Sequence, residues 1–296
     1  MRWLLLFSAV PLLAWGGPAL AATQTDFADC QQMQDLNLGI AGCTKIAEDP
    51  NGIVSDRATA YFDRGIDHFV RGELDAAIAD WSASVKLVPT YAHAYNNLAK
   101  AYRAKGDYQH ALDGYSQAIK LDPQLVSAFK GRGITYFANG DAAKAEADFR
   151  RAESMDSSDP YTALWLNIAV RRQNQPYDIT KSAIHLNMGA WPAPLLLLYA
   201  GQVNPHEVAV SAQNIDPVIT QARLCDAYFF IGESMLLSSD KGDKDEATDL
   251  FQRTLKVCPA TADQYSVAAA ELKAMGKPLE APGESAEQGA PAKSVQ

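Results

Sequence analysis

Four cysteines carry the most definite chemistry in this sequence. Cys30 and Cys43 lie on either side of a turn expected near Leu36, and Cys225 and Cys258 lie almost symmetrically about Gly242. Such pairs could form disulfides, bind a metal ion or supply a reactive thiol. The chain has no CxxC and no histidine at ligand spacing, which argues against a metal site. We therefore predict two disulfides, Cys30–Cys43 and Cys225–Cys258, and an oxidising compartment.

Three short strings imitate catalytic motifs but lack their essential residues. GRG at 131–133 has no third glycine of a dinucleotide-binding loop, and GES at 232–234 has no final glycine of a nucleophile elbow. HE at 206–207 lacks the second histidine of a zinc-protease helix, and the chain's other histidines are scattered singly. The sequence therefore predicts no catalytic site, no cofactor and no metal ion.

Composition narrows the class of partner. The 296 residues include 26 Lys and Arg against 35 Asp and Glu, which gives a net charge of −9. An acidic chain lacks the basic surface that coats nucleic acid, so we expect no nucleic-acid partner.

The first residues have the layout of a secretory signal peptide. Arg2 precedes an apolar stretch that runs from Trp3 to Trp15, and a small-x-small cleavage site, Ala-Leu-Ala at 19–21, follows a Gly-Gly-Pro break. We expect cleavage near Ala21 and a periplasmic protein. The first cysteine, Cys30, is not placed as a lipid-attachment site, and no apolar run is long enough to span a membrane. We therefore expect neither a lipid anchor nor a membrane span.

One pattern recurs three times between residues 58 and 159. Gly72, Gly106 and Gly140 are spaced by a constant 34 residues (106 − 72 = 140 − 106 = 34). Three other kinds of position share this period: a small residue, an alanine and an aromatic. They are Gly65, Ala99 and Gly133; Ala77, Ala111 and Ala145; and Trp81, Tyr115 and Phe149.

Each repeating position has a physical reason in a helix-turn-helix unit. Small residues let two antiparallel helices approach closely, the aromatic fills the space beside them, and the glycine ends the first helix by adopting a positive φ. One hairpin cannot bury its apolar face alone, so successive units must stack. Over 58–159 the residues resemble the tetratricopeptide repeat (TPR) family, which implies an all-α, right-handed helical solenoid with a concave groove that holds peptides or extended partners.

The rest of the chain is expected to be helical without a fixed period. Apolar patterning predicts helices over 159–172, 179–188, 194–200 and 206–213, a helix pair with its loop near 238–243, and a closing helix that contains Tyr265 and Leu272. The expected division is a signal peptide (1–21), an N-terminal helical hairpin (22–57), three TPR units (58–159), an irregular TPR-like region (160–276) and a disordered tail (277–296).

The TPR resemblance also implies which residues line the groove, because the inward positions of the first helix in each unit can be carried over. The implied groove residues are Phe62, Ile66 and Phe69; Asn96, Asn97, Lys100 and Arg103; Lys130, Ile134 and Phe137; and Trp165 and Arg171. Aromatic residues here could seat apolar side chains, and the cations could pair with carboxylates. Alternatively, the apolar members pack against neighbouring helices and the cations are solvated.

A second resemblance covers about 55–276. DPYTALWLNIA, WPAPLLLLYAG and CDAYFFIGESML, in this order after three TPR units, look like the NlpI family of bacterial envelope proteins. This resemblance implies a homodimeric periplasmic adaptor that docks an envelope protease and cell-wall hydrolases. The lipid-attachment cysteine of that family is absent.

These observations favour a non-catalytic periplasmic adaptor that binds other proteins through its groove and regulates peptidoglycan hydrolases or a protease of the cell envelope. Two alternatives stay open: an assembly factor for a pilus, secretion or polysaccharide-export system, and a glycan-binding module.

Overall fold

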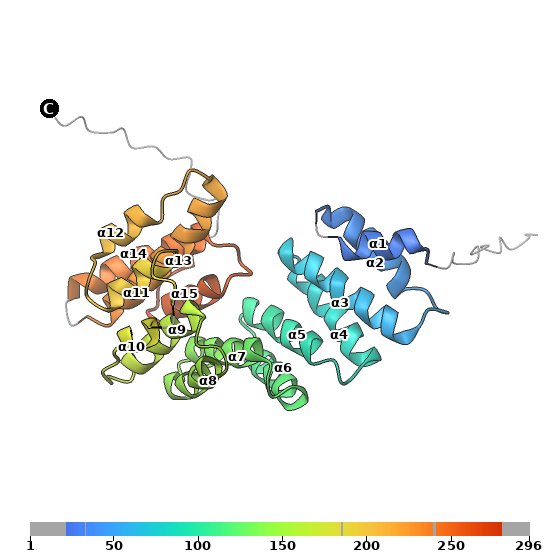
Figure 1. The fold of residues 1–296 in the computed structure, drawn as a ribbon, viewed down its shortest axis with the longest axis horizontal. Coiled ribbons are helices and arrows are strands. Elements are labelled where there is room, and N and C mark those ends of the chain that lie inside the picture. The colour runs from blue at the N-terminus through green and yellow to red at the C-terminus, as the bar shows by residue number, and fades with distance from the viewer. Residues whose placement is uncertain (1–21, 33, 185, 239–240, 280–296) are drawn as a thin grey trace, which may run out of the picture.

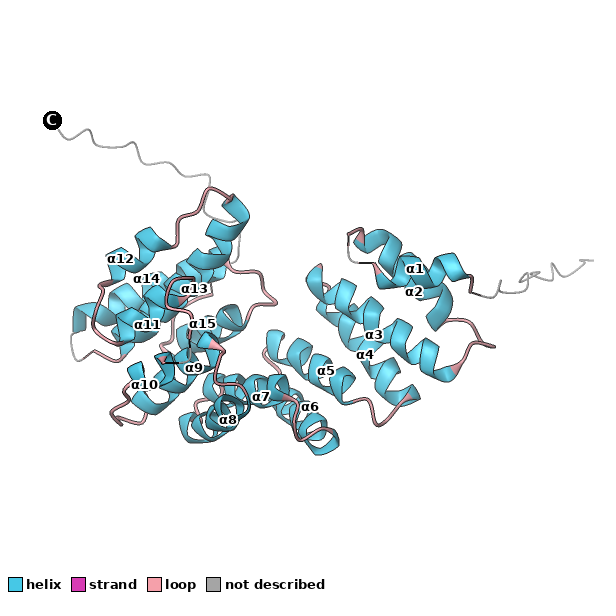
Figure 2. Cartoon of the chain, in the orientation of Figure 1, coloured by secondary structure: helices cyan, strands magenta, loops and turns pink. Residues whose placement is uncertain are grey.

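The computed structural model describes residues 22–32, 34–184, 186–238 and 241–279. Within these ranges the chain forms helices and no strands (Figure 2). The helices are α1 (Gln24–Gln31), α2 (Leu36–Ala47), α3 (Val54–Val70), α4 (Leu74–Leu87), α5 (Ala92–Ala104), α6 (Tyr108–Leu121), α7 (Val126–Ala138), α8 (Ala142–Met155), α9 (Pro160–Arg171), α10 (Thr180–Ala183), α11 (Ala193–Tyr199), α12 (Pro205–Ser211), α13 (Pro217–Leu236), α14 (Lys241–Val257) and α15 (Asp263–Ala274). The expected all-α fold is confirmed.

The three predicted units are the hairpins α3/α4, α5/α6 and α7/α8. Gly72, Gly106 and Gly140 lie in their turns at φ values of 76°, 78° and 84°, which other residues rarely adopt. Asp107 and Asp141 then cap α6 and α8 by accepting backbone N–H groups of the first turn. The glycine spacing therefore predicted the turns correctly.

Close approach of the paired helices explains the repeating small residue. A β-carbon added at Gly65 would lie 2.6 Å from Nε1 of Trp81, and one at Gly133 would lie 2.8 Å from a ring carbon of Phe149. The Trp81 indole N–H also donates to the backbone carbonyl of Phe62 at 3.0 Å. The ring thus occupies the space that a larger side chain would need.

An additional hairpin, α1/α2, precedes the repeats and packs through α2 on α3. Cys30 in α1 and Cys43 in α2 are joined, with an S–S distance of 2.05 Å. Thr23 forms a reciprocal capping box with Asp26 at the start of α1. The hairpin therefore continues the stack by one further layer.

The C-terminal part departs from the repeat. The helix expected over 179–188 is only α10, and Ile184 and Met188, which lie beyond its end, are 77% and 37% exposed, so burial does not stabilise its continuation. The expected loop at 238–243 is shorter, since Gly242 and Asp243 already belong to α14. The longest hairpin, α13/α14, is bridged by Cys225–Cys258 with an S–S distance of 2.11 Å.

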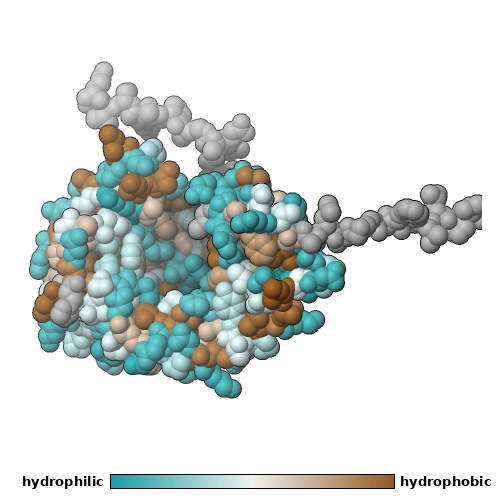
Figure 3. Space-filling model, turned by 45° about the vertical axis from the view of Figure 1, so that its right-hand side comes forward, coloured by the Kyte–Doolittle hydropathy of each residue, from teal (hydrophilic) through white to brown (hydrophobic). Residues whose placement is uncertain are grey.

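The helices form an open arch (Figure 1). One arm contains α1 to α4, the other contains α9 to α15, and α5 to α8 join them. The space-filling view shows the hollow between the arms (Figure 3). The last helix, α15, contacts α5 and α7 as well as α13 and α14, so it returns to the inner side of the repeats.

The predicted signal peptide and residues 280–296 of the predicted tail lie outside the described residues. Among the helices that are described, none has both the length and the apolar character needed to cross a bilayer.

Candidate functional site: the concave surface

The inner side of the arch is lined by the first helix of each hairpin, with α5 and α7 on the inside of α6 and α8 (Figure 1). The predicted groove residues fall into two groups. Half-buried, and so accessible at the surface, are Phe62, Ile66, Asn97, Lys100, Lys130 and Arg171. Buried are Phe69, Asn96, Arg103, Ile134, Phe137 and Trp165. We call the surface formed by Phe62, Ile66, Asn97, Lys100 and Lys130 the open half.

The prediction that Ile134, Phe137 and Trp165 bind a partner is wrong. Their exposed fractions are 1%, 5% and 2%, and all three belong to the main hydrophobic core. Trp165 lies at its centre, with ring centroids 5.1 Å from Phe229 and 5.6 Å from Phe230. Because α13 supplies these two rings, it covers the inner face of α9 that would otherwise line the groove.

Phe69 and Asn96 are also too buried to contact a partner directly. Phe69 packs against Trp81 with ring centroids 5.6 Å apart, and the Lys100 ammonium lies 5.0 Å above its ring. The Asn96 amide donates to Oδ1 of Asn97 at 3.2 Å. Both buried residues therefore support a neighbour that is accessible, because the ring attracts the cation and the amide orients the second asparagine.

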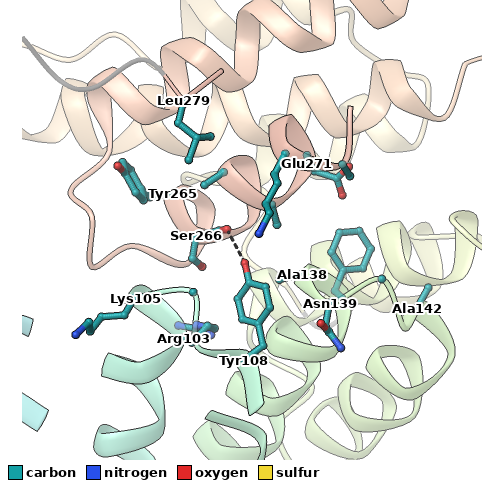
Figure 4. Close-up of a pocket in the computed structure, with 18 of the residues that line it drawn as sticks. Arg103, Lys105, Tyr108, Ala138, Asn139, Ala142, Tyr265, Ser266, Glu271 and Leu279 are labelled. Atoms are coloured by element: carbon teal, nitrogen blue, oxygen red, sulfur yellow. Dashed lines mark hydrogen bonds between the residues drawn. The ribbon is translucent and has the colours of Figure 1, made fainter. Parts of the chain in front are cut away.

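Arg103 is not available to a partner because α15 covers it. Its guanidinium is 2% exposed and pairs through Nη2 with Asp263, at the start of α15. The adjacent Tyr108 donates its hydroxyl to the backbone carbonyl of Ser266 at 3.4 Å (Figure 4). α15 is thus attached to the inner side of the second unit by polar contacts.

A second ion-pair network fixes the other end of α15. Arg172 donates from Nη2 to Glu233 of α13 at 2.8 Å and lies 3.0 Å from Glu271 of α15. Complete burial raises the pKa of the Glu233 carboxyl although Arg172 pairs with it. The neighbouring Arg171 donates to the backbone carbonyl of Tyr199 at 3.0 Å, so it stabilises the fold rather than facing the hollow freely. We call the inner surface that α13 and α15 cover, which includes Arg103, Ile134, Phe137 and Trp165, the closed half.

The open half has an acidic end that sequence reasoning missed. Asp63 lies on α3 between Phe62 and Arg64, and burial together with the neighbouring Asp67 raises the pKa of Asp63 to about 6. Burial also raises the pKa of Asp67, whose Oδ2 has no hydrogen-bond partner among the residues that the structure describes. The four-residue spacing of the two aspartates on the inner face of a helix was the signal that could have revealed them.

Aromatic and cationic groups complete the open half. The Phe62 and Tyr91 rings lie 5.0 Å apart. Lys130 pairs with Asp159, the residue that caps α9, and its side chain remains 28% exposed. The surface therefore presents an aromatic pair, a carboxylate of raised pKa and two lysines. Among the described residues, no group of His, Cys, Asp and Glu is arranged to hold a metal ion.

A model of the TPR repeat matches residues 67–103 and 99–140. The chain contains tetratricopeptide repeats. The matched residues cover α5 and α6 and reach the end of α7, which carry most of the open half.

Two relatives extend this comparison. The chain is 26% identical over 245 residues to the "Lipoprotein NlpI homolog" of Haemophilus influenzae, a match that covers 81% of this chain and 77% of that protein. A tetratricopeptide repeat protein from Parabacteroides merdae is 14% identical and superposes with a TM-score of 0.50, covering 80% of this chain and 93% of the other. The second similarity concerns the fold alone.

Proposed function

We propose that this protein is a non-catalytic adaptor that binds a protein partner on the open half of its concave surface. The proposal rests on one observation: inner side chains at the same repeat position are accessible in one part of the arch and buried in another. Phe62, Ile66 and Lys100 face the hollow partly uncovered, whereas Ile134, which lies 34 residues after Lys100 in the same repeat position, is buried in the core that α13 completes. Accessible aromatic and cationic side chains beside one another are typical of protein-binding surfaces.

We further propose that the protein works in the periplasm and regulates an envelope protease and cell-wall hydrolases. The signal-peptide layout of residues 1–21 supports export. The two cysteine pairs, which lie within disulfide distance, are what an oxidising compartment favours. The partner class follows from the resemblance to the NlpI family, and the 26% identity to the NlpI homologue supports that resemblance.

Photocrosslinking from two matched positions tests the adaptor proposal. A benzoylphenylalanine at Asn97 lies on the open half, whereas one at Lys120 lies exposed on α6, on the outer side of the same unit. In cells that express the protein, we expect a protein adduct from position 97 and none from position 120. Mass spectrometry of the adduct identifies its class: a protease or hydrolase supports the regulatory proposal, and a secretion component supports the assembly alternative. Equal adducts from both positions, or adducts from 120 alone, contradict the proposal.

Binding measurements with the captured partner then quantify the site. The double variant F62A/K100E removes an aromatic and reverses a charge on the open half, and we expect it to weaken binding at least tenfold, or about 1.4 kcal/mol. K86E/K120E changes two exposed lysines on α4 and α6 and serves as the control. An unchanged affinity for F62A/K100E would exclude the open half as the binding surface.

A further inference from the structure

A large cleft separates α15 from the turns of the second and third repeats. Its volume is about 910 Å³, within the range of ligand-binding pockets. Its walls include Arg103, Lys105 and Tyr108 on one side and Tyr265 and Glu271 on the other (Figure 4). The cleft belongs to the closed half, and the proposed adaptor function does not use it.

Hydrogen-bond donors without acceptors surround this cleft. Arg103 is 2% exposed, yet within the described part of the chain its Nε and Nη1 have no partner and only Nη2 pairs, with Asp263. Nε of Arg172 is likewise buried and unpaired. A buried guanidinium with unfilled donors is unfavourable unless an acceptor reaches it. Lys273 adds an exposed cation at the rim. The cleft is thus suited to an anionic ligand, although the whole chain is acidic.

Eight of the residues that line the cleft have very small side chains. They are Ala104, Gly106, Ala138, Gly140, Ala142, Ala269, Ala270 and Ala274. Small side chains let the backbone of an extended chain approach closely. The cleft therefore favours an extended acidic peptide over a compact ligand.

The chain itself supplies such a peptide at the rim. Leu279, the last described residue of the C-terminal part, lines the cleft, and the amide of Gln252 donates to the carbonyl of Pro278 at 2.7 Å, which fixes the direction of the chain there. The following residues, 280–296, carry Glu280, Glu284 and Glu287 against one lysine, so their side chains have a net charge of −2 (−3 + 1).

We propose that residues 280–296 bind in the cleft between α15 and the repeat turns, with their carboxylates directed to the exposed ammonium groups of Lys105 and Lys273, near the buried guanidinium of Arg103. Seventeen residues (296 − 279) reach up to about 56 Å when extended, more than enough to follow the cleft. Because the segment is tethered at the rim, its effective concentration is in the millimolar range, and weak contacts suffice for occupancy. An acidic segment of another protein would then have to compete with residues 280–296.

Peptide binding in trans tests this proposal. The probe is a fluorescein-labelled synthetic peptide of residues 280–296, titrated by fluorescence anisotropy into two forms of the chain from Ala22, one complete and one that ends at Leu279. We expect saturable binding to the shortened form and at least tenfold weaker apparent binding to the complete form, where the tethered segment competes. Replacing the three glutamates of the peptide by glutamine should weaken binding at least fivefold, because charge carries recognition.

Charge variants separate specific binding from general attraction. In the shortened chain K105E/K273E should weaken peptide binding at least fivefold, while K86E, at an exposed lysine on α4, should leave it unchanged. In the complete chain, removal of residues 280–296 should speed amide hydrogen exchange at 104–108 and 265–273. Three results would overturn the proposal. The first is that the peptide shows no saturable binding up to about 1 mM, and the second is that it binds both forms of the chain equally, which would leave the cleft free for another molecule. The third is that K86E weakens peptide binding as much as K105E/K273E does.

Discussion

The two halves of the concave surface begin from the same repeating pattern and end in different environments. Ile66 on α3 and Ile134 on α7 are implied groove residues at the same repeat position, yet Ile66 is half-buried whereas Ile134 is 1% exposed within the core. The difference comes from α13 and α15, which lie outside the repeats. The repeat register therefore determines which side chains point inward, but helices elsewhere in the chain determine which of them a partner can reach.

The largest difference between the halves should appear on removal of an aromatic ring. Trp165→Ala empties the centre of the core, where four rings lie within 6.1 Å of Trp165, and should destabilise the fold by about 3–5 kcal/mol. Phe62→Ala, at a half-buried position, should cost about 1 kcal/mol. Urea unfolding followed by circular dichroism measures both. Equal losses of unfolding free energy in the two variants would show that Trp165 is no more buried than Phe62.

The two disulfides allow a similar comparison between the ends of the arch. Cys225–Cys258 joins residues separated by 33 positions and Cys30–Cys43 joins residues separated by 13. In the loop-entropy description their removal as paired serine variants should cost about 4 and about 3 kcal/mol. Thermal unfolding under oxidising conditions should therefore show the larger loss for C225S/C258S. A larger loss for C30S/C43S would mean that the N-terminal hairpin depends on its bridge more than loop length predicts.

Attachment of α15 can be tested at its buried arginine. Arg103→Leu removes the ion pair with Asp263, whose side chain is 34% exposed and so can be solvated afterwards. We expect a loss of about 1–2 kcal/mol and faster hydrogen exchange over Asp263–Ala274. Arg253→Leu, at an exposed pair with Asp249, is the control and should change stability by less than 0.5 kcal/mol, a rough upper value for surface pairs. Unchanged exchange in R103L would show that α15 is held by its apolar contacts alone.

The smallest expected effect concerns pH at the open half. The pKa of Asp63 is raised to about 6 in the folded chain, above the value near 4 of an exposed aspartate, so the folded state binds the proton more tightly than the unfolded state. The Asp63 contribution to the free energy of unfolding therefore decreases as pH rises from about 4 to about 6. Above pH 6 the buried carboxylate is ionised, and its full destabilising effect on the folded state is present. Asp63→Asn should raise the midpoint of thermal unfolding at pH 7.5 and change it little at pH 4. An equal effect at both pH values would rule out this titration.

The sequence was sufficient for the features that repeat. Gly72, Gly106 and Gly140 marked the turns because only a residue without a β-carbon adopts their φ comfortably, and the cysteine positions about each turn indicated the pairs that the structure joins. The burial of Trp165 and Arg103 could not be predicted in the same way, because it depends on packing against Phe229 and Asp263, which lie far along the chain and outside the period. Asp63 was missed because its pKa depends on burial rather than on residue type.

Hydrogen exchange of the complete protein, with and without the partner captured at Asn97, tests the central claim most directly. If the open half is the binding surface, partner addition slows exchange at the inner-facing segments of α3 and α5, around Phe62 to Phe69 and Asn96 to Lys100, and leaves α9 and α13 unchanged. Slower exchange confined to α9, α13 or the outer helices α4 and α6 would contradict the account.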